Sequence, residues 1–431
     1  MYRESWRDNT MKNFFNAIGV ADMEKVHSAM IAWILDDSND PNNHRGSHGT
    51  SNFSTFPIKE RSEILCNMFG IGVRLFQSIR THVEWNDIDI MIETNDGNRN
   101  EIWVIENKLK TPEHKSKVDS TQKTNWGISS DEIWQTEKYE YIINDYIKTL
   151  KNSISGKHFL LLSMGGDVAK SPTGKWKSLK YERWHCMLNS YPATSSSMFM
   201  IREYINSIGE LINSLSNFIA TPVAYPNVFM KRKKSEKEAM LNSPSSSAIT
   251  PNERYILENG LETIFQKQHL IEMMVKAKLP TTNLIIDEDH GIAEFDLTIY
   301  TIKDSCKLEM YLQVQFQNGT FKAVLKHERY RNPEPNDSKE IYGNKIAGKW
   351  NGKWYDKFVD TEKVYKNNGW SLYKAWMTSI NPKPRISLCK AMSIKKNQKW
   401  YDYNDPKILT SYIKGFNDAV AVINYIHALK P

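Results

Sequence analysis

Two neighbouring apolar segments that carry charge in their middle constrain this chain more than any other feature. They are residues 87–92 (DIDIMI) and residues 102–108 (IWVIENK), and a polar turn at residues 95–98 joins them. Both segments predict strands that are apolar enough to be buried. Because burying a carboxylate or an ammonium group is costly unless it is paired or binds a metal, the charges in these strands need partners.

The spacing of the charged residues predicts where those partners lie. Side chains alternate between the two faces of a strand, so Glu106 and Lys108 share one face. Asp89 precedes the turn by about as many residues as Glu106 follows it, so an antiparallel hairpin would set the two carboxylates side by side. That arrangement suits a divalent metal and a water molecule to be activated. Asp87 shares the face of Asp89 in this interpretation and is an alternative or additional ligand.

Length and composition predict a globular protein with more than one domain. A chain of 431 residues, 40% apolar and 25% charged, is long enough for two or three domains. No apolar run approaches the ~20 residues of a membrane helix, and the first residues lack the apolar core of a signal peptide. The cysteines are far apart and have no paired spacing, which argues against a structural zinc site or a disulfide framework and predicts a reducing cytoplasm. They are Cys66, Cys186, Cys306 and Cys389.

Apolar periodicity and breaker residues divide the chain into two predicted domains. The expected boundaries are a first domain at residues 1–225, a basic and Ser/Pro-rich linker at 226–251, and a C-terminal α+β domain at 252–431. Helices are predicted at residues 23–37, 58–69, 132–152, 198–220, 252–278 and 406–429, and further strands at 157–164, 293–302, 308–317 and 321–327. Residues 110–130 are polar and are predicted to be irregular.

The C-terminal half contains a basic region that is rich in aromatic residues. Residues 322–400 hold 18 Lys+Arg against 7 Asp+Glu within a chain whose net charge is only +7. Basic charge interleaved with aromatic side chains is typical of a surface that contacts nucleic acid. The candidate contacts are Lys349, Trp350, Lys353, Trp354 and Lys357. The alternative is a solvated basic face whose aromatic residues fill a small core.

The order of the elements resembles a known family. A helix, a strand with Asp89, a strand with Glu106-Asn107-Lys108, a helix and an apolar strand together resemble the PD-(D/E)XK nuclease superfamily over residues 20–215. Glu106-Asn107-Lys108 stands for the (D/E)-x-K element and Asp89 for the aspartate before it, although the proline–aspartate pair is absent. The resemblance implies an α/β (α+β) restriction-endonuclease-like fold, in which a mixed central sheet of an α-β-β-α-β core is flanked by helices.

Further motifs are similar to one branch of this superfamily. In that branch the first helix carries a Glu followed by His-Ser, and a Gln-x-x-x-Tyr helix follows the lysine. The matching residues here are Glu24, His27, Ser28, a His-x-Gly-like loop at His44, Gln135, Tyr139, the apolar strand at residues 159–162, and Trp176 to Tyr181.

The resemblance also implies roles for the site residues. Asp89, Glu106 and Glu24, with the backbone carbonyl of Asn107, would hold Mg²⁺, for which Mn²⁺ would substitute. Lys108 would position the attacking water and offset charge at the phosphate. Because two carboxylates lie near it, Lys108 should remain charged rather than act as a simple general base.

Other polar residues have a functional and an ordinary reading. Gln135 would orient the water or a phosphate, and Tyr139 lies one helical turn further on, so both can face the site. The alternative for both is ordinary helix packing. His27 and Ser28 are expected to cap or pack against the sheet, and His44 and His48 are expected to be loop residues.

The function predicted from the resemblance is that of a metal-dependent DNA endonuclease in prokaryotic defence or DNA processing, with a homodimer as one arrangement. The sequence contains no phosphate-binding loop of the Walker type, no dinucleotide-binding glycine motif and no Gly-x-Ser-x-Gly elbow. Two alternatives remain open. One is a non-catalytic nuclease-like module that binds nucleic acid or protein, and the other is a nuclease specific for RNA or for branched DNA.

Overall fold

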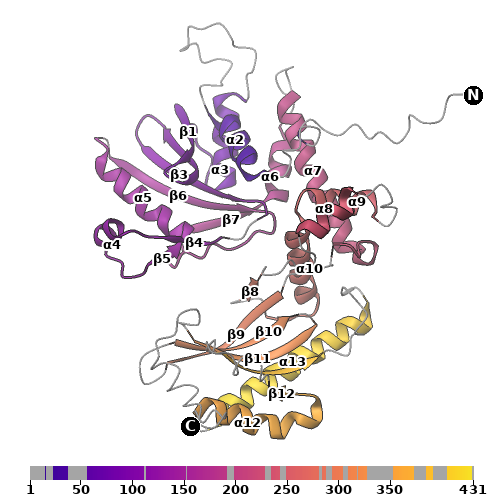
Figure 1. Ribbon diagram of the computed structural model, residues 1–431. Coiled ribbons are helices and arrows are strands. Elements are labelled where there is room, and N and C mark those ends of the chain that lie inside the picture. Colours follow the sequence, from indigo (N-terminus) through magenta and orange to yellow (C-terminus); the bar gives the residue numbers. More distant parts are fainter. Residues whose placement is uncertain are drawn as a thin grey trace, which may run out of the picture. The chain divides into compact units, whose positions relative to one another are not determined.

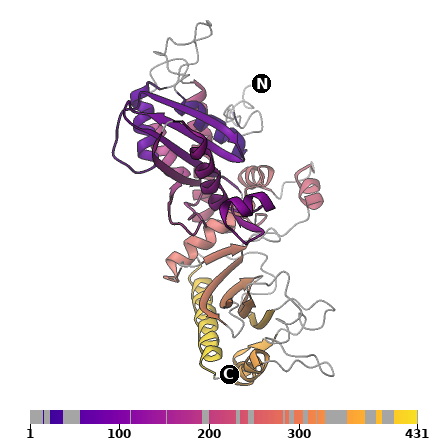
Figure 2. The same ribbon diagram turned by 90° about the vertical axis from the view of Figure 1, so that its left-hand side faces the viewer.

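The computed structural model divides the chain into two compact units, Met1–Ser216 and Asn217–Pro431, and each is described by itself (Figure 1, Figure 2). The structure describes residues 15, 23–36, 56–110, 113–151, 153–191, 199–228, 234–242, 249–280, 284–287, 294–303, 309–317, 319–327, 353–372, 385–391 and 405–429. Among these residues, none of the helices combines the length and the apolar character that crossing a membrane requires.

A mixed five-stranded sheet forms the centre of the first unit. Its strands are β1 (Ser78–Trp85), β2 (Ile88–Asn95), β3 (Asn100–Lys108), β6 (Ile154–Ser163) and β7 (Trp176–Lys180), in the spatial order β1-β2-β3-β6-β7. The pairs β1–β2 and β2–β3 are antiparallel, whereas β3–β6 and β6–β7 are parallel. This mixed sheet is the arrangement expected of a restriction-endonuclease-like core.

The predicted hairpin of two charged strands is confirmed, with one correction at its start. Strand β2 begins at Ile88 rather than at Asp87. Asn86 and Asp87 instead form the two-residue turn between β1 and β2, with φ angles of 49° and 67°. Asn and Asp tolerate such positive φ angles better than other residues with side chains. Strand β1 was not predicted, because only Ile79 among its residues is buried and it has no apolar run.

Helices cover both faces of this sheet (Figure 1). Helix α5 (Gln135–Thr149) packs Tyr139 and Ile143 against Met91 and Val104 on one face. The opposite face is covered by α2 (Glu24–Leu35), α3 (Ile58–Met68) and α6 (Tyr181–Asn189), whose contacts include the edge-to-face pair of Phe69 and Trp103 at 4.9 Å. The two faces thereby bury almost all of β3.

The segment between β3 and α5, predicted to be irregular, contains regular structure. It holds β4 (Lys115–Lys117), α4 (Ser120–Trp126) and β5 (Glu132–Trp134), and β4 pairs with β5. The helix predicted at residues 132–152 is therefore shorter and begins at Gln135. Helix α4 buries no residue. Because its sequence lacks an apolar stripe, periodicity could not predict it.

Three further elements follow the first sheet in the chain, around the division between the units. Helix α7 (Phe199–Ala220) confirms the helix predicted at residues 198–220 and runs across the division at Ser216. The short η3 (Pro222–Ala224) follows it, and helix α8 (Lys234–Asn242) lies within the segment that was expected to be a linker.

An antiparallel sheet with helices on one face forms the second unit. Its strands are β8 (Leu284–Asp287), β9 (Glu294–Lys303), β10 (Glu309–Gln317), β11 (Thr320–His327), β12 (Ser371–Leu372) and β13 (Arg385–Ala391), in the order β12-β13-β11-β10-β9-β8. The predicted hairpin of β10 and β11 is confirmed. The predicted last helix, α13 (Pro406–Ala428), lies along the sheet and contributes Tyr412 and Phe416 to its core (Figure 2).

The helix predicted at residues 252–278 is two helices. These are α9 (Pro251–Glu258) and α10 (Glu262–Lys276), and Gly260 between them has a φ of 63°. A left-handed residue ends a helix, and glycine adopts that conformation without a steric penalty. The basic region also contains a helix that periodicity did not reveal, α12 (Lys353–Tyr365), followed by η4 (Lys366–Asn368).

Candidate active site

The ends of β2 and β3 bring Asp89, Glu106 and Lys108 together, as the sequence predicts. Ile90 pairs with Ile105 across the hairpin, which sets Asp89 opposite Glu106 on the neighbouring strand. The amide N of Asn107 donates a hydrogen bond of 2.8 Å to Oδ2 of Asp89. Nζ of Lys108 lies 2.7 Å from Oε1 of Glu106. Three charged groups thus share one end of the sheet, on the face that α5 covers.

Burial makes the charges of this cluster unusual. Glu106 is 0% exposed, and its burial, together with the charge of Asp89, raises its pKa well above the usual value. Burial also raises the pKa of Asp89, although the Lys108 ammonium and the Asn107 amide partly offset this. For Lys108, burial alone would lower the pKa, but attraction to Glu106, Asp89 and Glu24 raises it overall. Two carboxylates here compete for one cation.

The donor set fits a divalent metal ion. Neither side-chain oxygen of the buried Glu106 accepts a well-aligned hydrogen bond from any described residue. Buried polar atoms without partners are rare. A cation that binds oxygen ligands would give the two Glu106 oxygens a partner. Within the described ranges, no three His, Cys, Asp or Glu side chains converge on one metal position. Asp89 and Glu106 would therefore hold a cation that takes its other ligands from water, backbone or substrate, as Mg²⁺ does.

Glu24 is beside this cluster but is anchored to the backbone. It is the first residue of α2, and its Oε1 accepts hydrogen bonds of 2.9 Å from the amides of Leu109 and Lys110, just beyond β3. Its charge acts on Asp89 and Lys108, which places it near the predicted metal ligands. One of its oxygens therefore holds the end of the catalytic strand.

Asn107 lies between Glu106 and Lys108, so its side chain is on the opposite face of β3. Its amide Nδ2 donates to Oγ of Ser28 at 3.0 Å and to the carbonyl of Glu24 at 3.0 Å, while its Oδ1 accepts from Tyr181 at 2.5 Å. His27 packs against the edge of Tyr181 with 5.4 Å between ring centroids. Asn107, Ser28 and His27 thus fasten α2 and α6 to the sheet, which matches the ordinary reading of His27 and Ser28.

Gln135 and Tyr139 lie on the first two turns of α5, on the same face as the carboxylates. Nε2 of Gln135 donates a hydrogen bond of 2.6 Å to the hydroxyl of Tyr139. The Tyr139 hydroxyl is fully buried and donates to the backbone carbonyl of Asp87. Burial and the nearby charges of Glu106 and Asp89 raise the pKa of Tyr139, so it stays protonated. The side chain of Asp87 is exposed and pairs with Lys138 at 3.1 Å.

A family comparison agrees with this geometry. The model of the PD-(D/E)XK nuclease superfamily matches residues 12–206. This part of the chain is therefore similar to the PD-(D/E)XK nuclease superfamily. Nucleases of this superfamily typically use divalent metal ions. No curated protein and no solved structure matches the chain. The match includes the whole Asp89, Glu106 and Lys108 cluster and ends before the second unit.

Two further residues of the first unit, Glu113 and His114, are not marked by any pattern in the sequence. Glu113 is buried, and its side chain accepts hydrogen bonds from the amide of Thr136 at 3.0 Å and from that of Lys170 at 2.7 Å. It thereby fixes the start of α5. The side chain of His114 is largely exposed. Burial of the remaining part of the ring, together with the charge of Lys108, lowers its pKa. No sequence signal marks either residue, because their partners are distant in the chain.

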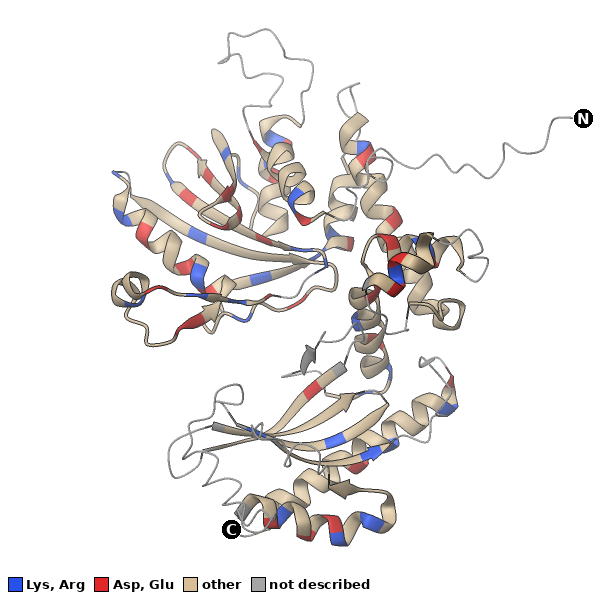
Figure 3. Cartoon of the chain, in the orientation of Figure 1, with Lys and Arg blue, Asp and Glu red and all other residues tan. Residues whose placement is uncertain are grey.

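The basic candidates follow residue 216 and so belong to the second unit. Lys349, Trp350 and the side chain of Lys353 are outside the described residues, as are His44 and His48. Trp354 is 5% exposed and belongs to the core of the second unit, and Nζ of Lys357 lies 4.2 Å from the centre of its ring. Along α12 the lysines alternate with Asp356, Asp360 and Glu362 (Figure 3). A buried Trp354 offers little surface to nucleic acid, as in the alternative reading of this region.

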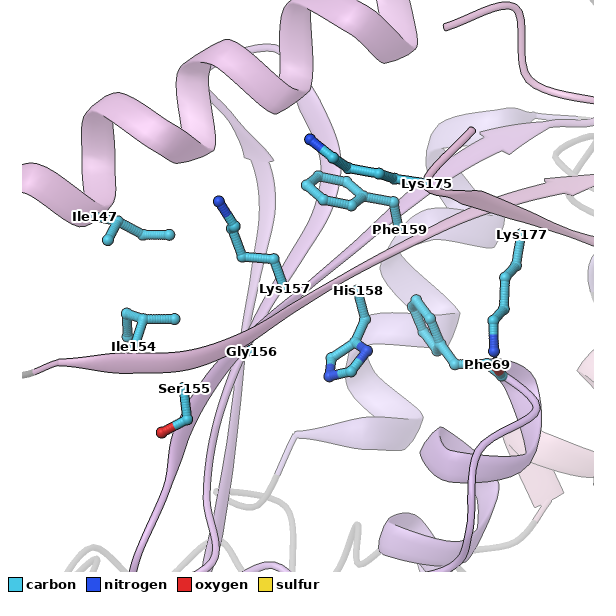
Figure 4. A pocket seen from close by; sticks show the side chains of 10 residues that line it. All are labelled: Phe69, Ile147, Ile154, Ser155, Gly156, Lys157, His158, Phe159, Lys175 and Lys177. Carbon is cyan, nitrogen blue, oxygen red and sulfur yellow. Dashed lines mark hydrogen bonds between the residues drawn. The ribbon is translucent and has the colours of Figure 1, made fainter. Parts of the chain in front are cut away.

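A pocket of about 560 Å³ lies at the beginning of β6 and contains none of the predicted catalytic residues (Figure 4). Its lysines hold the structure together. Nζ of Lys157 donates to Asn144 at 2.6 Å, Nζ of Lys175 lies 3.1 Å from Glu140, and Nζ of Lys177 donates to the carbonyl of Phe69 at 2.5 Å. The cluster of Asp89, Glu106 and Lys108 is instead at the other end of the strands.

Proposed function

We propose that this protein is a Mg²⁺-dependent endonuclease that hydrolyses phosphodiester bonds in DNA. The observation that carries the proposal is the pair of opposed carboxylates, Asp89 and Glu106, with the ammonium of Lys108 at 2.7 Å from Glu106. The oxygens of the buried Glu106, which accept no well-aligned hydrogen bond from the described residues, support a cation at this position. Mn²⁺ should substitute, because it accepts the same oxygen ligands.

The chemistry follows from what phosphodiester hydrolysis needs. Asp89 and Glu106 would hold the cation, with the backbone carbonyl of Asn107 as a further ligand, and the bound cation would offset negative charge on the phosphate and help to deprotonate water. Lys108, held charged by three carboxylates, would attract the phosphate and position the attacking water. Glu24 would keep the end of β3 in place so that Glu106 and Lys108 remain in register.

The second unit would select the substrate, sense a trigger or mediate assembly, with two copies of the chain acting on the two strands. A role in prokaryotic defence or DNA processing would fit a nuclease unit joined to a unit that selects the substrate, senses a trigger or mediates assembly. The alternatives are a nuclease for RNA or branched DNA and a non-catalytic binding module. The Asp89, Glu106 and Lys108 set favours catalysis, because a binding module has no need of two carboxylates, one of them fully buried, next to a buried lysine.

The test is cleavage of supercoiled plasmid, linear DNA, branched DNA and RNA by the full chain, with Mg²⁺, with Mn²⁺ and with EDTA. We expect nicking or cutting of DNA that EDTA abolishes. Lys108→Ala and Glu106→Ala should each lower the rate about 100-fold or more, because several kcal/mol of charge stabilisation are lost.

The matched control is Lys148→Ala, which removes a surface lysine from the last turn of α5 that pairs only with Asp145 at 2.8 Å. This variant should cut like the wild type. If the protein cleaves only RNA or branched DNA, the result would support the alternative of a nuclease specific for those substrates. If every nucleic acid stays intact in every reaction, the proposed nuclease function is wrong and the non-catalytic binding module is the hypothesis that remains.

A further inference from the structure

The segment between β3 and α5 helps to build a second pocket of the first unit, which contains none of the predicted catalytic residues. Its walls are the β4–β5 hairpin, the loop after α4 and the loop before β7 (Figure 1). Most of the residues that line it are exposed, so a ligand can enter from solvent. Its volume is about 520 Å³. Pockets for small ligands span about 300–1,000 Å³.

The hairpin turns the indole of Trp134 toward this pocket. Trp134 on β5 stands directly opposite Lys115 on β4, so the two side chains share one face of the hairpin. Ile133 points to the opposite face, because side chains alternate along a strand, and it is buried. Trp134 is only half-buried. A half-buried indole that lines a pocket offers a flat apolar surface to a ligand.

Two lysines from different segments lie over this indole. Nζ of Lys170 is 4.4 Å from the ring centroid, and Nζ of Lys115 is 5.3 Å from it. Lys170 comes from the loop before β7, and its backbone amide is fixed by a hydrogen bond of 2.7 Å to Glu113. Both lysine side chains are exposed. An aromatic ring flanked by cations suits a nucleotide, because the base stacks on the ring and the phosphate attracts the cations.

The alternative is that the two lysines only stabilise the hairpin by resting on the ring. A cation–π contact at an exposed site is weaker than the stacking of a base on an aromatic side chain. A base that enters the pocket would therefore displace the ammonium groups from the ring. Because lysine side chains are long and flexible, the same ammonium groups would turn to the phosphate of that nucleotide.

The two carboxylates of the pocket have roles within the protein. Glu137 caps the start of α5, because its side chain accepts a hydrogen bond from the backbone amide of Trp134. Glu132 stands opposite Lys117 across the hairpin, so opposite charges face each other there. The cap ties Trp134 to the helix whose first residue is Gln135. The pocket therefore adjoins the first turn of α5, which carries part of the candidate site.

The position of the ring in a pocket selects an unpaired nucleotide. In a duplex the faces of each base are covered by the neighbouring base pairs, and only the base edges are open in the grooves. A ring that lines a pocket can stack on the face of a base only when that base has left the stack. Single strands offer such bases without the cost of unpairing.

We propose that this pocket binds one unpaired nucleotide of the nucleic acid that the enzyme cleaves. The base stacks on Trp134, and the phosphate lies beside Lys115 and Lys170. The inference rests on the proposed nuclease function for the identity of this ligand as substrate. It narrows the substrate to a single strand, or to a duplex with an overhang, a flap or a frayed end, whose unpaired nucleotide lies next to the first turn of α5.

Binding of single-stranded DNA to the full chain tests the stacking contact. The probe is a dye-labelled strand of about 12 nucleotides, and EDTA keeps it intact during the measurement. Trp134→Leu should raise the dissociation constant about tenfold, because the stacking of one base is lost. Trp134→Phe keeps an aromatic ring and should bind nearly as well as the wild type. The affinity for a blunt duplex should be the same in both variants and in the wild type.

Salt dependence tests the phosphate contact. Lys115→Met and Lys170→Met should each reduce the slope of log affinity against log salt concentration by about 0.7, the value for one phosphate contact on a single strand. Lys148→Met, at the exposed end of α5, should leave the slope unchanged. The control for the indole is Trp126→Leu on α4, whose ring already stacks on Tyr141 with 5.0 Å between centroids. This variant should bind the single strand like the wild type.

Three results would overturn the pocket assignment. The first is a single-strand affinity that Trp134→Leu leaves unchanged, and the second is an equal loss of affinity in Trp126→Leu. The third is binding of dCMP as tight as that of the strand, because the pocket would then take a free nucleotide. If the wild type cuts no nucleic acid although the binding results hold, the proposed function fails, whereas the pocket remains a site for unpaired nucleotides. If the wild type cuts and Trp134→Leu binds normally, the pocket assignment alone fails.

Discussion

Glu106 is the residue on which the candidate site depends most. It is a fully buried carboxyl group opposite a second carboxylate, Asp89, and only the ammonium of Lys108 lies close enough to balance the charge among the described side chains. One cation cannot balance the charges of both carboxylates, of which Glu106 is fully buried and Asp89 partly buried. The site is therefore less stable without a metal ion than an apolar core would be. Such a conflict between stability and charge is typical of functional sites.

Glu106→Gln should stabilise the metal-free protein while it abolishes cleavage. The folded pKa of Glu106 is raised above the usual 4.5, so the folded protein retains a proton that the unfolded chain loses. Stability therefore falls as pH rises from that value through the folded pKa. We expect the variant to melt above the wild type in EDTA at alkaline pH, with a gap that narrows in acid. Thermal melts across pH check this, and a gap independent of pH would contradict it.

Glu24 allows a second test at the level of a single oxygen. Gln at this position keeps the Oε1 acceptor for the amides of Leu109 and Lys110, whereas Ala removes it and leaves two buried donors unpaired. Glu24→Ala should lower the free energy of unfolding by about 1–3 kcal/mol, and Glu24→Gln should be close to the wild type. Urea unfolding measures both. If Glu24→Gln cleaves as poorly as Glu106→Gln, Glu24 is a metal ligand rather than an anchor.

Helix α5 organises much of the first unit. Its first turn carries Gln135, and its side chains hold the β1–β2 turn through Lys138 and Tyr139. One turn further on, Glu140 is buried and accepts hydrogen bonds from Ser171 at 2.6 Å. It also accepts from Thr173 at 2.6 Å and from the indole of Trp176 at 3.1 Å. The same helix thus positions the site and the segment that leads into β7.

Glu140→Gln should destabilise the protein although the change is isosteric. The amide would place an NH₂ group among the hydroxyls of Ser171 and Thr173 and the indole of Trp176, which are all donors to the carboxylate. We expect a loss of about 1–3 kcal/mol in the free energy of unfolding, measured by urea titration. The same change at the exposed Glu132 is the control and should have little effect. Equal stability of the two variants would show that this network is not stabilising.

At the scale of the whole molecule, each unit has a hydrophobic core of its own among the described residues. The core around α5 contains Met91, Val104 and Tyr139, and all its members precede residue 217. The core around α13 contains Phe321 and Phe416, and all its members follow residue 216. No residue belongs to both of these cores. A change inside one of them should therefore leave the packing of the other intact.

Gly415→Ala should destabilise the second unit alone. A Cβ at this position of α13 would lie 2.6 Å from the ring of Phe321 on β11, so the helix or the ring must move. Overpacking of this kind costs about 1–3 kcal/mol. We expect calorimetry to show one transition at a lower temperature while metal-dependent melting of the first unit is unchanged. Asn417→Ala, at an exposed position of the same helix, is the control. A shift of both transitions would show that the units unfold together.

The sequence by itself determined the hairpin of the candidate site. A turn predicted at residues 95–98 and found at 96–99 sets the register, and the period-2 alternation of a strand then places Asp89 opposite Glu106 and Lys108 beside it. These are local properties, since every residue involved lies within about twenty positions of the others. The long amphipathic helices α7 and α13 were predictable for the same reason, because a repeated apolar stripe marks a helix wherever it packs.

Only the tertiary structure decided what surrounds that hairpin. Glu24 reaches the amides beyond β3 from 85 positions away, and Tyr139 reaches the β1–β2 turn from 52 positions away. Neither contact leaves a periodic signal in the sequence. Asp87 was predicted to be in a strand but is in the turn, and Trp354 contributes to a core rather than to an exposed surface. Hydrogen bonds and burial of this kind depend on which distant segments meet, and composition and spacing do not record that.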